Sequence, residues 1–349
     1  MKKCCSNCFE DSIIKFLFED LGEVNNCDYC GSRELKCIEV NHDEFKTIFS
    51  FFNEIYSVNP VRHSAKILDL LLIEWSIFSK ESPKVLDLAQ DIIKNTPGLD
   101  VDAYYTLQPK YEKFRQMFWD FSFEISYKRR FNLEMQDELK AIMEQLISNR
   151  STLINRDAVF YRARIGGETD KYNNVIAPFK NIENLGMPPH KIASIGRANP
   201  RGIPYLYLAD KYDTAVAEVR PWVGAKVSVG KFKINDPIRV VDLNSSIFHS
   251  FFDSIINFET RIGMNELGKW LSYELSKPID PNESDLEYLP TQYLSEFIRN
   301  NAFAGIRYKS SMSTGNNMVL FNQYNIDFVE SFLFNIEGID YNMNPVSIL

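Results

Sequence analysis

Several features of membrane, secreted and nucleotide-dependent redox proteins are missing from this chain of 349 residues. No apolar run approaches the roughly 20 residues that a bilayer-spanning helix needs, and the first residues lack the apolar core of a secretion signal. Internal repeats and low-complexity tracts are also absent. These absences argue against a membrane-spanning chain and predict a cytoplasmic protein.

A surplus of positive charge is missing as well. The formal net charge is -8, whereas phosphate backbones and anionic membrane surfaces are bound by clustered lysine and arginine. We therefore expect neither nucleic acid nor a membrane as a partner. Hydrophobic residues make up 45% and charged residues 25% of the chain, which is typical of a soluble globular protein. The length favours at least two domains.

Cysteine is confined to the first 37 residues, where all six cysteines lie. Two Cys-x-x-Cys pairs, Cys5 with Cys8 and Cys27 with Cys30, are separated by 18 residues. Two such knuckles can surround one tetrahedral ion, and thiolates in a reducing compartment favour zinc. The alternative is a redox or disulfide pair, which a reducing cytosol disfavours. The pattern predicts a structural zinc knuckle over residues 1-40.

Two cysteines are left over. Cys4 could replace Cys5 as a ligand, whereas Cys37 is expected to pack in the interior. A site with four thiolates leaves no open position for water, so we expect this metal to hold structure and to do no chemistry.

Helical periodicity follows the knuckles up to residue 150. Apolar residues recur at helical spacing in residues 45-56 and 139-147. Residues 65-78 are apolar nearly all round and predict a central buried helix, residues 97-109 predict a loop, and residues 111-130 predict a further helix. The pattern predicts an all-α helical bundle over residues 41-150, with a regulatory or docking role.

A candidate site lies in residues 196-220, which read GRANPRGIPYLYLADKYDTAVAEVR. A loop carrying Arg197 leads into a short alternating strand with Tyr207 and then into a helix that reaches Glu218. Arginine binds phosphate, tyrosine offers a stacking surface, and a carboxylate stabilises a developing cation. The alternative is a surface arginine, a half-buried strand and a solvated glutamate.

These residues resemble the core of the RES-domain family, the toxin half of bacterial toxin-antitoxin pairs. The family pattern of a Gly-Arg-x-Asn loop, a Leu-Tyr strand and an Ala-x-x-Glu helix matches residues 196-199, 206-207 and 215-218. Upstream, FYRARIGG places Arg162 in the position of the family's first arginine, and downstream GIRYKSS places the family serine at Ser310. The strand NNMVLF follows. The resemblance covers residues 158-335, and one departure is Ala198, where many relatives carry an aromatic residue.

The resemblance implies an α+β fold with a split β-sheet like that of ADP-ribosyltransferases, which bind NAD in a cleft between two small sheets. Strands and helices do not alternate regularly, which also favours α+β. We place this catalytic domain at residues 157-349. Some relatives carry an N-terminal helical domain similar to the HEPN bundles, but the arginine-histidine pair of active HEPN nucleases is missing from the sequence.

The resemblance also implies roles for individual residues. Arg162 and Arg197 would bind the diphosphate of NAD or an incoming phosphate, and Tyr207 would stack with or orient the nicotinamide. Glu218 would bond the ribose and stabilise its positive charge, and Ser310 would orient Glu218 or the substrate. Alternatives stay open at several positions. Arg164 could take the role of Arg162, and Tyr205 could take the stacking role of Tyr207. Asn199 and Asn317 could either contact the ligand or form turns.

The sequence contains no Gly-x-Gly-x-x-Gly, phosphate loop, His-Glu-x-x-His or Gly-x-Ser-x-Gly motif. A bound NAD+ would therefore be consumed. The resemblance implies an NAD+-degrading toxin or defence effector that uses phosphate or water as acceptor, held in check by an antitoxin or by the N-terminal bundle. Two alternatives remain: transfer of ADP-ribose to a macromolecule, and a non-catalytic zinc-knuckle adaptor.

Overall fold

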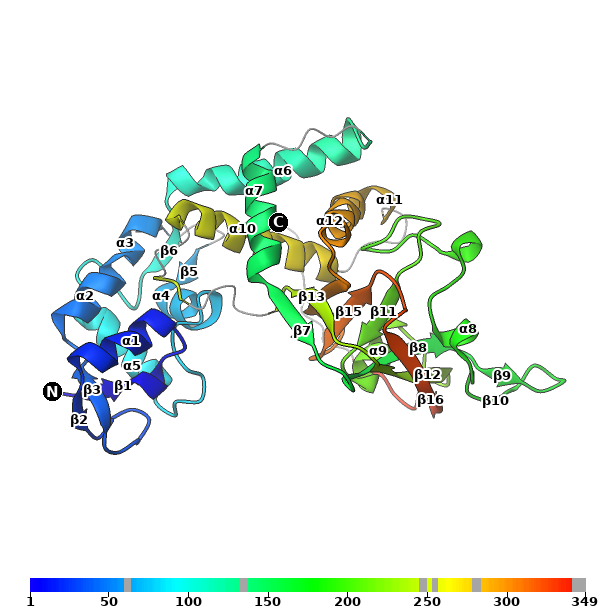
Figure 1. Cartoon of the computed structure of the whole chain (residues 1–349), viewed down its shortest axis with the longest axis horizontal. Helices are drawn as coiled ribbons and strands as arrows, with labels where there is room; N and C mark the ends of the chain where they lie inside the picture. Colours follow the sequence, from blue (N-terminus) through cyan, green and yellow to red (C-terminus); the bar gives the residue numbers. More distant parts are fainter. Residues whose placement is uncertain (60–63, 132–136, 245–249, 253–256, 278–283, 341–349) are drawn as a thin grey trace. The chain divides into compact units, whose positions relative to one another are not determined.

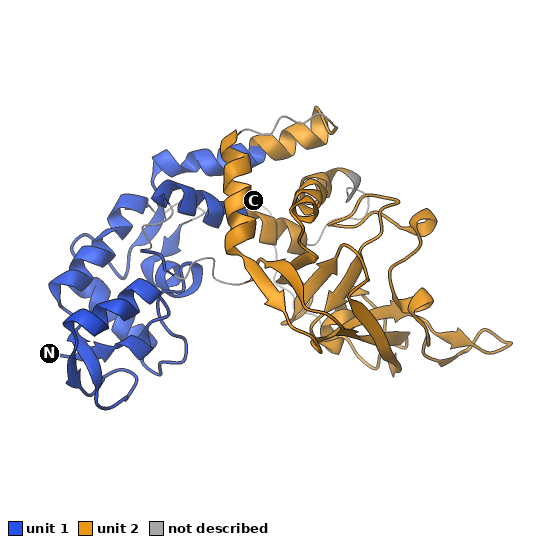
Figure 2. Cartoon of the chain, in the orientation of Figure 1, with its two compact units in different colours: residues 1–119, 246–267 blue, residues 120–245, 268–349 orange. Residues whose placement is uncertain are grey.

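The computed structural model describes residues 1-59, 64-131, 137-244, 250-252, 257-277 and 284-340. The chain divides into two compact units, Met1–Trp119 with Ser246–Leu267, and Asp120–Ser245 with Gly268–Leu349 (Figures 1 and 2). Each unit is described below by itself. No helix among the described residues is long and apolar enough to cross a bilayer.

The first unit combines short helices with two small sheets. Its helices are α1 (Ser12–Leu21), α2 (Asp43–Ser50), α3 (Phe52–Ile55), α4 (Ile67–Asp69) and α5 (Val85–Asn95). Its strands are β1 (Lys3–Cys5), β2 (Glu23–Asn25), β3 (Leu35–Glu39), β4 (Tyr56–Val58), β5 (Ala65–Lys66) and β6 (Tyr104–Leu107). Helices α6 (Glu112–Tyr127) and α10 (Phe258–Ser276) each begin in this unit and end in the second.

The prediction of an all-α bundle is wrong for this region. Strands β4, β6 and β5 form a three-stranded antiparallel sheet inside it. The predicted loop at residues 97-109 contains β6, because its run of two tyrosines, a threonine and a leucine favours a pleated, half-buried strand. The predicted helix at residues 65-78 is also interrupted: after α4 it continues only as a π-helical turn, Leu70–Glu74.

Packed phenylalanine rings form the interior of the first unit. Phe9 and Phe78 have ring centroids 5.1 Å apart, and Phe49 lies 5.9 Å from Phe78. Phe45 stacks on Phe9 at 5.8 Å. Helix α2 contributes Phe45 and Phe49 from one face, as their spacing of four residues requires. The apolar periodicity in the sequence therefore identified this core correctly, although it did not identify every element around it.

The second unit is built on one large sheet with helices packed against it. Its strands are β7 (Ser151–Ile154), β8 (Val159–Ile165), β11 (Leu206–Ala209), β12 (Lys226–Ile234), β13 (Ile238–Asp242), β14 (Gly305–Lys309), β15 (Asn316–Leu320) and β16 (Ile326–Asn335), with a separate hairpin of β9 (Glu168–Thr169) and β10 (Val175–Ala177). Its helices are α7 (Asp137–Asn149), α8 (Ile182–Leu185), α9 (Tyr212–Glu218), α11 (Ser284–Glu287) and α12 (Leu289–Asn300). A mixed helix and sheet fold is thus confirmed.

The order of the large sheet is β16-β12-β8-β11-β15-β14-β13-β7. Strand β8 pairs with β12 along its whole length, whereas β8 and β11 are in register at one position, where Tyr161 faces Ala209. Beyond that pair the two strands part, so the sheet has two well-paired halves with a narrow join. The expected split into two small sheets stays a prediction, because the eight strands form one hydrogen-bonded sheet.

Apolar residues cover both faces of the sheet near the join. On one face, Leu206 and Leu208 of β11 belong to a buried cluster with Phe160, Phe232 and Met318. On the other face, α9 packs against β8, and its Ala215 contacts Ala163 and Ala209. Small side chains at these three positions let the helix approach the sheet closely. This close approach brings the end of α9 to the opening between β8 and β11.

Candidate active site and cysteine cluster

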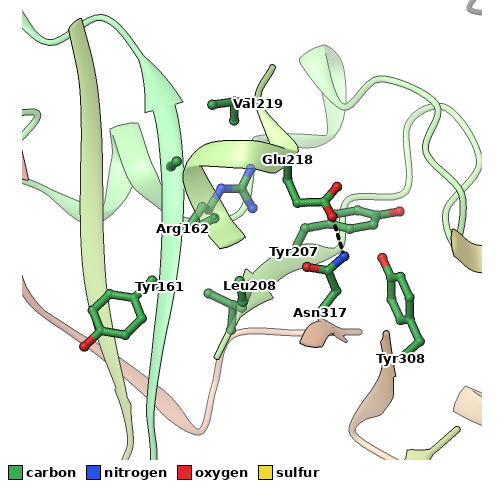
Figure 3. A pocket seen from close by; sticks show the side chains of 11 residues that line it. Tyr161, Arg162, Tyr207, Leu208, Glu218, Val219, Tyr308 and Asn317 are labelled. Atoms are coloured by element: carbon green, nitrogen blue, oxygen red, sulfur yellow. Dashed lines mark hydrogen bonds between the residues drawn. The ribbon is translucent and has the colours of Figure 1, made fainter. Parts of the chain in front are cut away.

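A cavity of about 230 Å³ lies at the join of the two sheet halves. Four of its lining residues form one row of paired positions across the sheet, in the order Tyr161, Ala209, Asn317 and Tyr308. Paired residues of neighbouring strands point to the same face, so this row forms the floor of the cavity. Figure 3 shows Tyr308 and Asn317 reaching toward the space below α9.

Glu218, the last residue of α9, supplies the carboxylate of the cavity. Its Oε1 accepts a hydrogen bond of 2.7 Å from the Ser310 hydroxyl and another of 2.7 Å from Nδ2 of Asn317. Ser310 is itself buried, and its Oγ accepts from the backbone amide of Met312 at 3.1 Å. Two neutral donors thus hold the carboxylate in one orientation and leave its other oxygen for a ligand.

Arg162 of β8 is the cation of the cavity. Its side chain lines the cavity, and its buried Nη1 has no hydrogen-bond partner among the described residues. Burial lowers the pKa of the Arg162 guanidinium to about 10, so the group stays charged at neutral pH. A buried charge without a partner costs free energy in the empty protein. An anionic ligand in the cavity would supply the missing acceptor.

Arg164, the alternative to Arg162, is engaged elsewhere. Its Nη1 donates to the backbone oxygen of Asn184 at 2.9 Å, and its guanidinium lies 5.3 Å from the ring centroid of Phe179. It does not line the cavity. Of the two arginines on this strand face, the described structure therefore leaves Arg162 for a ligand.

Tyr207 of β11 forms a wall of the cavity and is fixed by the preceding loop. Its hydroxyl donates to Oδ1 of Asn199 at 2.7 Å and accepts from the backbone amide of Ala198 at 3.1 Å. Burial raises the pKa of the Tyr207 phenol well above its usual value, so the hydroxyl remains protonated. The ring is thereby held rigidly while its polar tip is already occupied.

Asn199 organises this loop. Its Nδ2 donates to the backbone oxygens of Ser194, Pro200 and Ile203 at 2.9 to 3.2 Å. Since its Oδ1 already accepts from Tyr207, the amide is used entirely within the protein. The structure therefore places Asn199 as the turn former of the two sequence alternatives, away from the cavity lining.

Helix α12 ties the same loop to the rest of the unit. Nε2 of Gln292 donates to the backbone oxygen of Gly196 at 2.9 Å, and Oγ1 of Thr291 donates to that of Arg197 at 2.5 Å. A side chain at Gly196 would bring its Cβ within 2.5 Å of the Tyr207 hydroxyl. Glycine is thus required here because Tyr207 and the loop backbone approach each other closely.

Arg197 and Tyr205 also lie outside the cavity lining. Nη1 of Arg197 donates to the backbone oxygen of Leu275 at 2.6 Å, which ties one nitrogen of its guanidinium to α10. Tyr205 precedes β11 and is buried, with its ring centroid 5.0 Å from that of Phe321. Arg162, Tyr207 and Glu218 therefore share one cavity, Ser310 supports it through Glu218, and Arg197, Tyr205 and Asn199 lie outside its lining.

Tyr308 and Tyr161 were not singled out from the sequence. Tyr308 lies two residues before Ser310, so strand alternation places both on one face, and this signal was available. Burial raises the pKa of the Tyr308 phenol well above its usual value, and the nearby Tyr207 and Glu218 raise it further. The position of Tyr161 depends on where β8 and β11 meet, which no local pattern indicates.

The four predicted cysteine ligands lie together in the first unit. The sulfur atoms of Cys5, Cys8, Cys27 and Cys30 are all within 4.8 Å of one another. The closest approaches are 3.4 Å between Cys5 and Cys30 and 3.5 Å between Cys8 and Cys27. Four ligands at the usual zinc-sulfur distance of about 2.3 Å lie at comparable separations, so the cluster has the size of a four-thiolate metal site.

Local backbone geometry supports this arrangement. The amide of Cys30 points at the sulfur of Cys27 with a distance of 3.4 Å, and Gly31 follows with φ at +77°. The other two cysteines turn away: the Cys4 sulfur lies 3.6 Å from the backbone oxygen of Ile38, and the Cys37 sulfur lies 3.7 Å from that of Asn25. Neither is part of the cluster.

Comparisons with known proteins bear on the second unit. The RES domain model matches residues 159–334. The crystal structure of the M. tuberculosis MbcT-MbcA toxin-antitoxin complex is similar at 15% sequence identity with a TM-score of 0.31, covering 56% of this chain and 94% of that chain. A search of the curated proteins found no match. The family match by itself spans half of the chain and includes Arg162, Glu218 and Ser310, and this protein therefore belongs to the RES-domain family.

Proposed function

We propose that this protein degrades NAD+ by cleaving the bond between nicotinamide and ribose, acting as a toxin or defence effector. The observation that carries the proposal is one cavity that holds both Arg162 and Glu218. Nη1 of Arg162 is buried and has no hydrogen-bond partner among the residues that the structure describes, and the Glu218 carboxylate is held in a fixed orientation. A dinucleotide supplies both complements: phosphate for the cation and a ribose for the carboxylate. Membership of the RES-domain family supports the same substrate.

The bond to nicotinamide is suited to such a site because nicotinamide leaves as a neutral molecule. Positive charge develops on the ribose in the transition state, and a nearby carboxylate stabilises it more than it stabilises the ground state. Glu218 takes this role because Ser310 and Asn317 both donate to one of its oxygens and leave the other for the sugar. An oxygen of phosphate or water then bonds to the anomeric carbon as the nicotinamide nitrogen departs with the bonding electrons.

The remaining lining residues fit the nicotinamide end of the ligand. Tyr207 and Tyr308, which lie near one another in Figure 3, offer aromatic surface to the cavity. Its volume of about 230 Å³ is below the ~300–1,000 Å³ typical of pockets that hold a whole ligand. The cavity therefore accommodates the nicotinamide riboside, with the diphosphate at Arg162 and the adenosine extending outward. The narrow join between the sheet halves also supports an ADP-ribosyltransferase-like fold.

Two alternatives use the same observations differently. Transfer of ADP-ribose to a macromolecule needs the same bond cleavage with another acceptor. A non-catalytic adaptor would leave the cavity without a reaction, which an unpartnered Arg162 beside an oriented Glu218 disfavours. Incubation with NAD+ labelled in the adenosine half separates the three functions. Degradation releases labelled ADP-ribose or its phosphate, transfer leaves the label on a macromolecule, and an adaptor leaves NAD+ unchanged.

The cofactor and partners follow the same proposal. Zinc fits the cluster of Cys5, Cys8, Cys27 and Cys30, because the donor set is four thiols and the described residues add no further ligand to it. Inorganic phosphate is a candidate acceptor. An antitoxin that covers the cavity, or control by the N-terminal unit, would keep the activity in check.

The deciding experiment compares NAD+ consumption by the full chain and its Glu218→Gln variant. We expect the substitution to lower kcat by about 100- to 1,000-fold, the usual effect of removing a preorganised electrostatic contact to the transition state. The matched control is Glu183→Gln, which changes an exposed glutamate of α8 in the same unit. If the wild type and both variants leave NAD+ intact under conditions in which all three are folded, the enzymatic proposal is wrong.

A further inference from the structure

A second cavity, of about 360 Å³, lies in the same unit beside the residue that orients Glu218. It is lined by Arg150, Lys269, Lys309, three serines and Tyr273, together with Leu243 and Gly268. Three of these residues are cationic and none of the described lining residues is acidic. The lining is therefore positive and rich in hydroxyl groups, which is the chemistry that binds phosphate.

Arg150 is the strongest observation in this cavity. It directly precedes β7, and only 5% of it is exposed. Its Nη1 donates to the backbone oxygen of Leu243 at 2.7 Å, but its buried Nε has no partner among the described residues. Burial lowers the pKa of the Arg150 guanidinium to about 10, which leaves it charged at neutral pH. The nearby Asp242 carboxylate offsets part of this charge, but the unused Nε donor at a cavity still favours an acceptor such as an anion.

Helix α10 is shaped to accommodate this guanidinium. A Cβ at Gly268 would lie 2.5 Å from Nη2 and 2.8 Å from Cζ of Arg150. Glycine inside a helix costs about 1 kcal/mol relative to alanine, so Gly268 weakens α10 in exchange for space. One turn further along the helix, Ser272 lines the cavity, followed by Ser276. Residues at this spacing share one helix face.

The third serine, Ser310, connects this cavity to the active site. It lines the second cavity while its hydroxyl proton goes to Glu218. Its oxygen already accepts from Met312, so in this state Ser310 offers the second cavity no proton. The hydroxyl of Ser276 is also occupied, because it donates to the backbone oxygen of Tyr273 at 3.2 Å. The donors for an anion are instead Arg150, Lys309 and Ser272.

We propose that this second cavity is a binding site for a phosphate group, distinct from the Arg162 cavity and partly built by Arg150, which precedes the matched RES domain. The phosphate is either free inorganic phosphate or the phosphate of a nucleotide. Phosphate binding here does not depend on turnover of NAD+. A phosphate that draws the Ser310 hydroxyl toward itself would release one of the two hydrogen bonds that orient Glu218.

The test is titration of the full chain with inorganic phosphate, and separately with ADP-ribose, by calorimetry and phosphorus NMR. Lys309→Gln removes an exposed lysine of the lining, and we expect at least about tenfold weaker binding, the usual effect of losing a hydrogen bond to a charged group. Ser272→Asp puts a negative charge at the same anion, and we expect binding to disappear. Lys180→Gln, an exposed lysine outside the cavity, is the control.

Two further variants keep the test independent of folding and of catalysis. The added methyl group of Gly268→Ala lies against Arg150 and should weaken phosphate binding. Lys309→Gln changes an exposed position and should keep the wild-type melting temperature. Glu218→Gln should still bind phosphate, because Glu218 does not line this cavity. A wild-type protein that binds phosphate but leaves NAD+ intact would contradict only the proposed function. If Ser272→Asp abolishes binding of inorganic phosphate, the ligand is the free ion. If it abolishes only binding of ADP-ribose, the ligand is a nucleotide. Absence of binding, or binding that Lys309→Gln and Ser272→Asp leave unchanged, overturns the proposal.

Discussion

The cysteine cluster of the first unit and the Arg162 cavity of the second were both expected from the sequence, but they are assembled differently. The cluster takes its four ligands from two short turns within the first 30 residues. The cavity takes its residues from β8, β11, α9, β14 and β15. A metal site can therefore be read from local spacing, whereas a ligand cavity depends on which strands become neighbours.

The two sites also differ in how their polar groups are satisfied. In the cluster each sulfur lies near another sulfur, and one metal ion would be coordinated by all four sulfur atoms. In the cavity Glu218 already has two donors, whereas Arg162 has an unpartnered nitrogen. The first arrangement is expected to stabilise the fold, and the second keeps a buried charge available for a ligand at some cost in stability.

The largest effect is expected from the cluster. Cys8→Ser should abolish metal binding and destabilise the first unit by about 5 kcal/mol or more, because binding energy at structural zinc sites is folding energy. Metal content and a thermal unfolding curve measure this. Cys37→Ser, which changes a cysteine outside the cluster, should retain the metal. Equal metal content in the two variants would contradict the four-cysteine site.

The next effect concerns the unpartnered cation. Arg162→Gln should lower kcat/KM for NAD+ by about 10- to 150-fold, the range for a lost hydrogen bond to a charged group. The melting temperature should hold or rise, because an uncompensated buried charge is removed. Arg164→Gln is the matched control, since Arg164 is bonded to Asn184 and outside the cavity. A larger loss of activity in Arg164→Gln would reverse our assignment of the two arginines.

The pH dependence of the cavity follows from the same group. The pKa of Arg162 is lowered by burial to about 10 from 12.5, so the cation needed for an anion is present below pH 10 and is lost as the pH rises through it. We expect KM for NAD+ to rise above about pH 10 in the wild type. The experiment measures KM from about pH 7 to about pH 11, a range that spans this pKa. Arg162→Gln should lack the rise in KM at alkaline pH. An identical alkaline limb in the variant would assign it to another group.

A smaller effect is expected from the serine that orients the carboxylate. Ser310→Ala removes one of two hydrogen bonds to Glu218 and leaves the one from Asn317. We expect kcat to fall by about tenfold, the equivalent of about 1.4 kcal/mol, with KM nearly unchanged. Ser311→Ala alters the exposed neighbour on the same turn and serves as control. Equal kinetics for both variants would show that Ser310 does not position Glu218.

The smallest effect is expected at the loop. Tyr207→Phe keeps the aromatic wall but loses the hydrogen bonds to Asn199 and Ala198, so the free energy of unfolding should fall by about 1 kcal/mol. Activity should fall only modestly if the ring is what contacts the ligand. Tyr212→Phe, at an exposed tyrosine of α9, is the control for denaturant unfolding. A total loss of activity would instead assign chemistry to the phenol.

Several elements of the second unit were predictable because their signals are local. Strand alternation around Tyr207 and Ser310 and the apolar face of α9 each depend on residues within a few positions. The bundle prediction failed for a related reason. Apolar periodicity marks burial well, but β4, β5 and β6 are two to four residues long and become strands through pairing with one another.

By itself, the sequence determined the chemistry that is available: four cysteines at knuckle spacing, a family match over residues 159–334, and the arginine, glutamate and serine that it contains. The tertiary structure alone decided which residues meet. It turned Arg197 toward Leu275 and left Nη1 of Arg162 without a hydrogen-bond partner in the described part of the chain, because the join at Tyr161 and Ala209 opens the sheet beside β8. Residue types follow from the chain, but a buried charge acquires or lacks a partner only when distant strands pack.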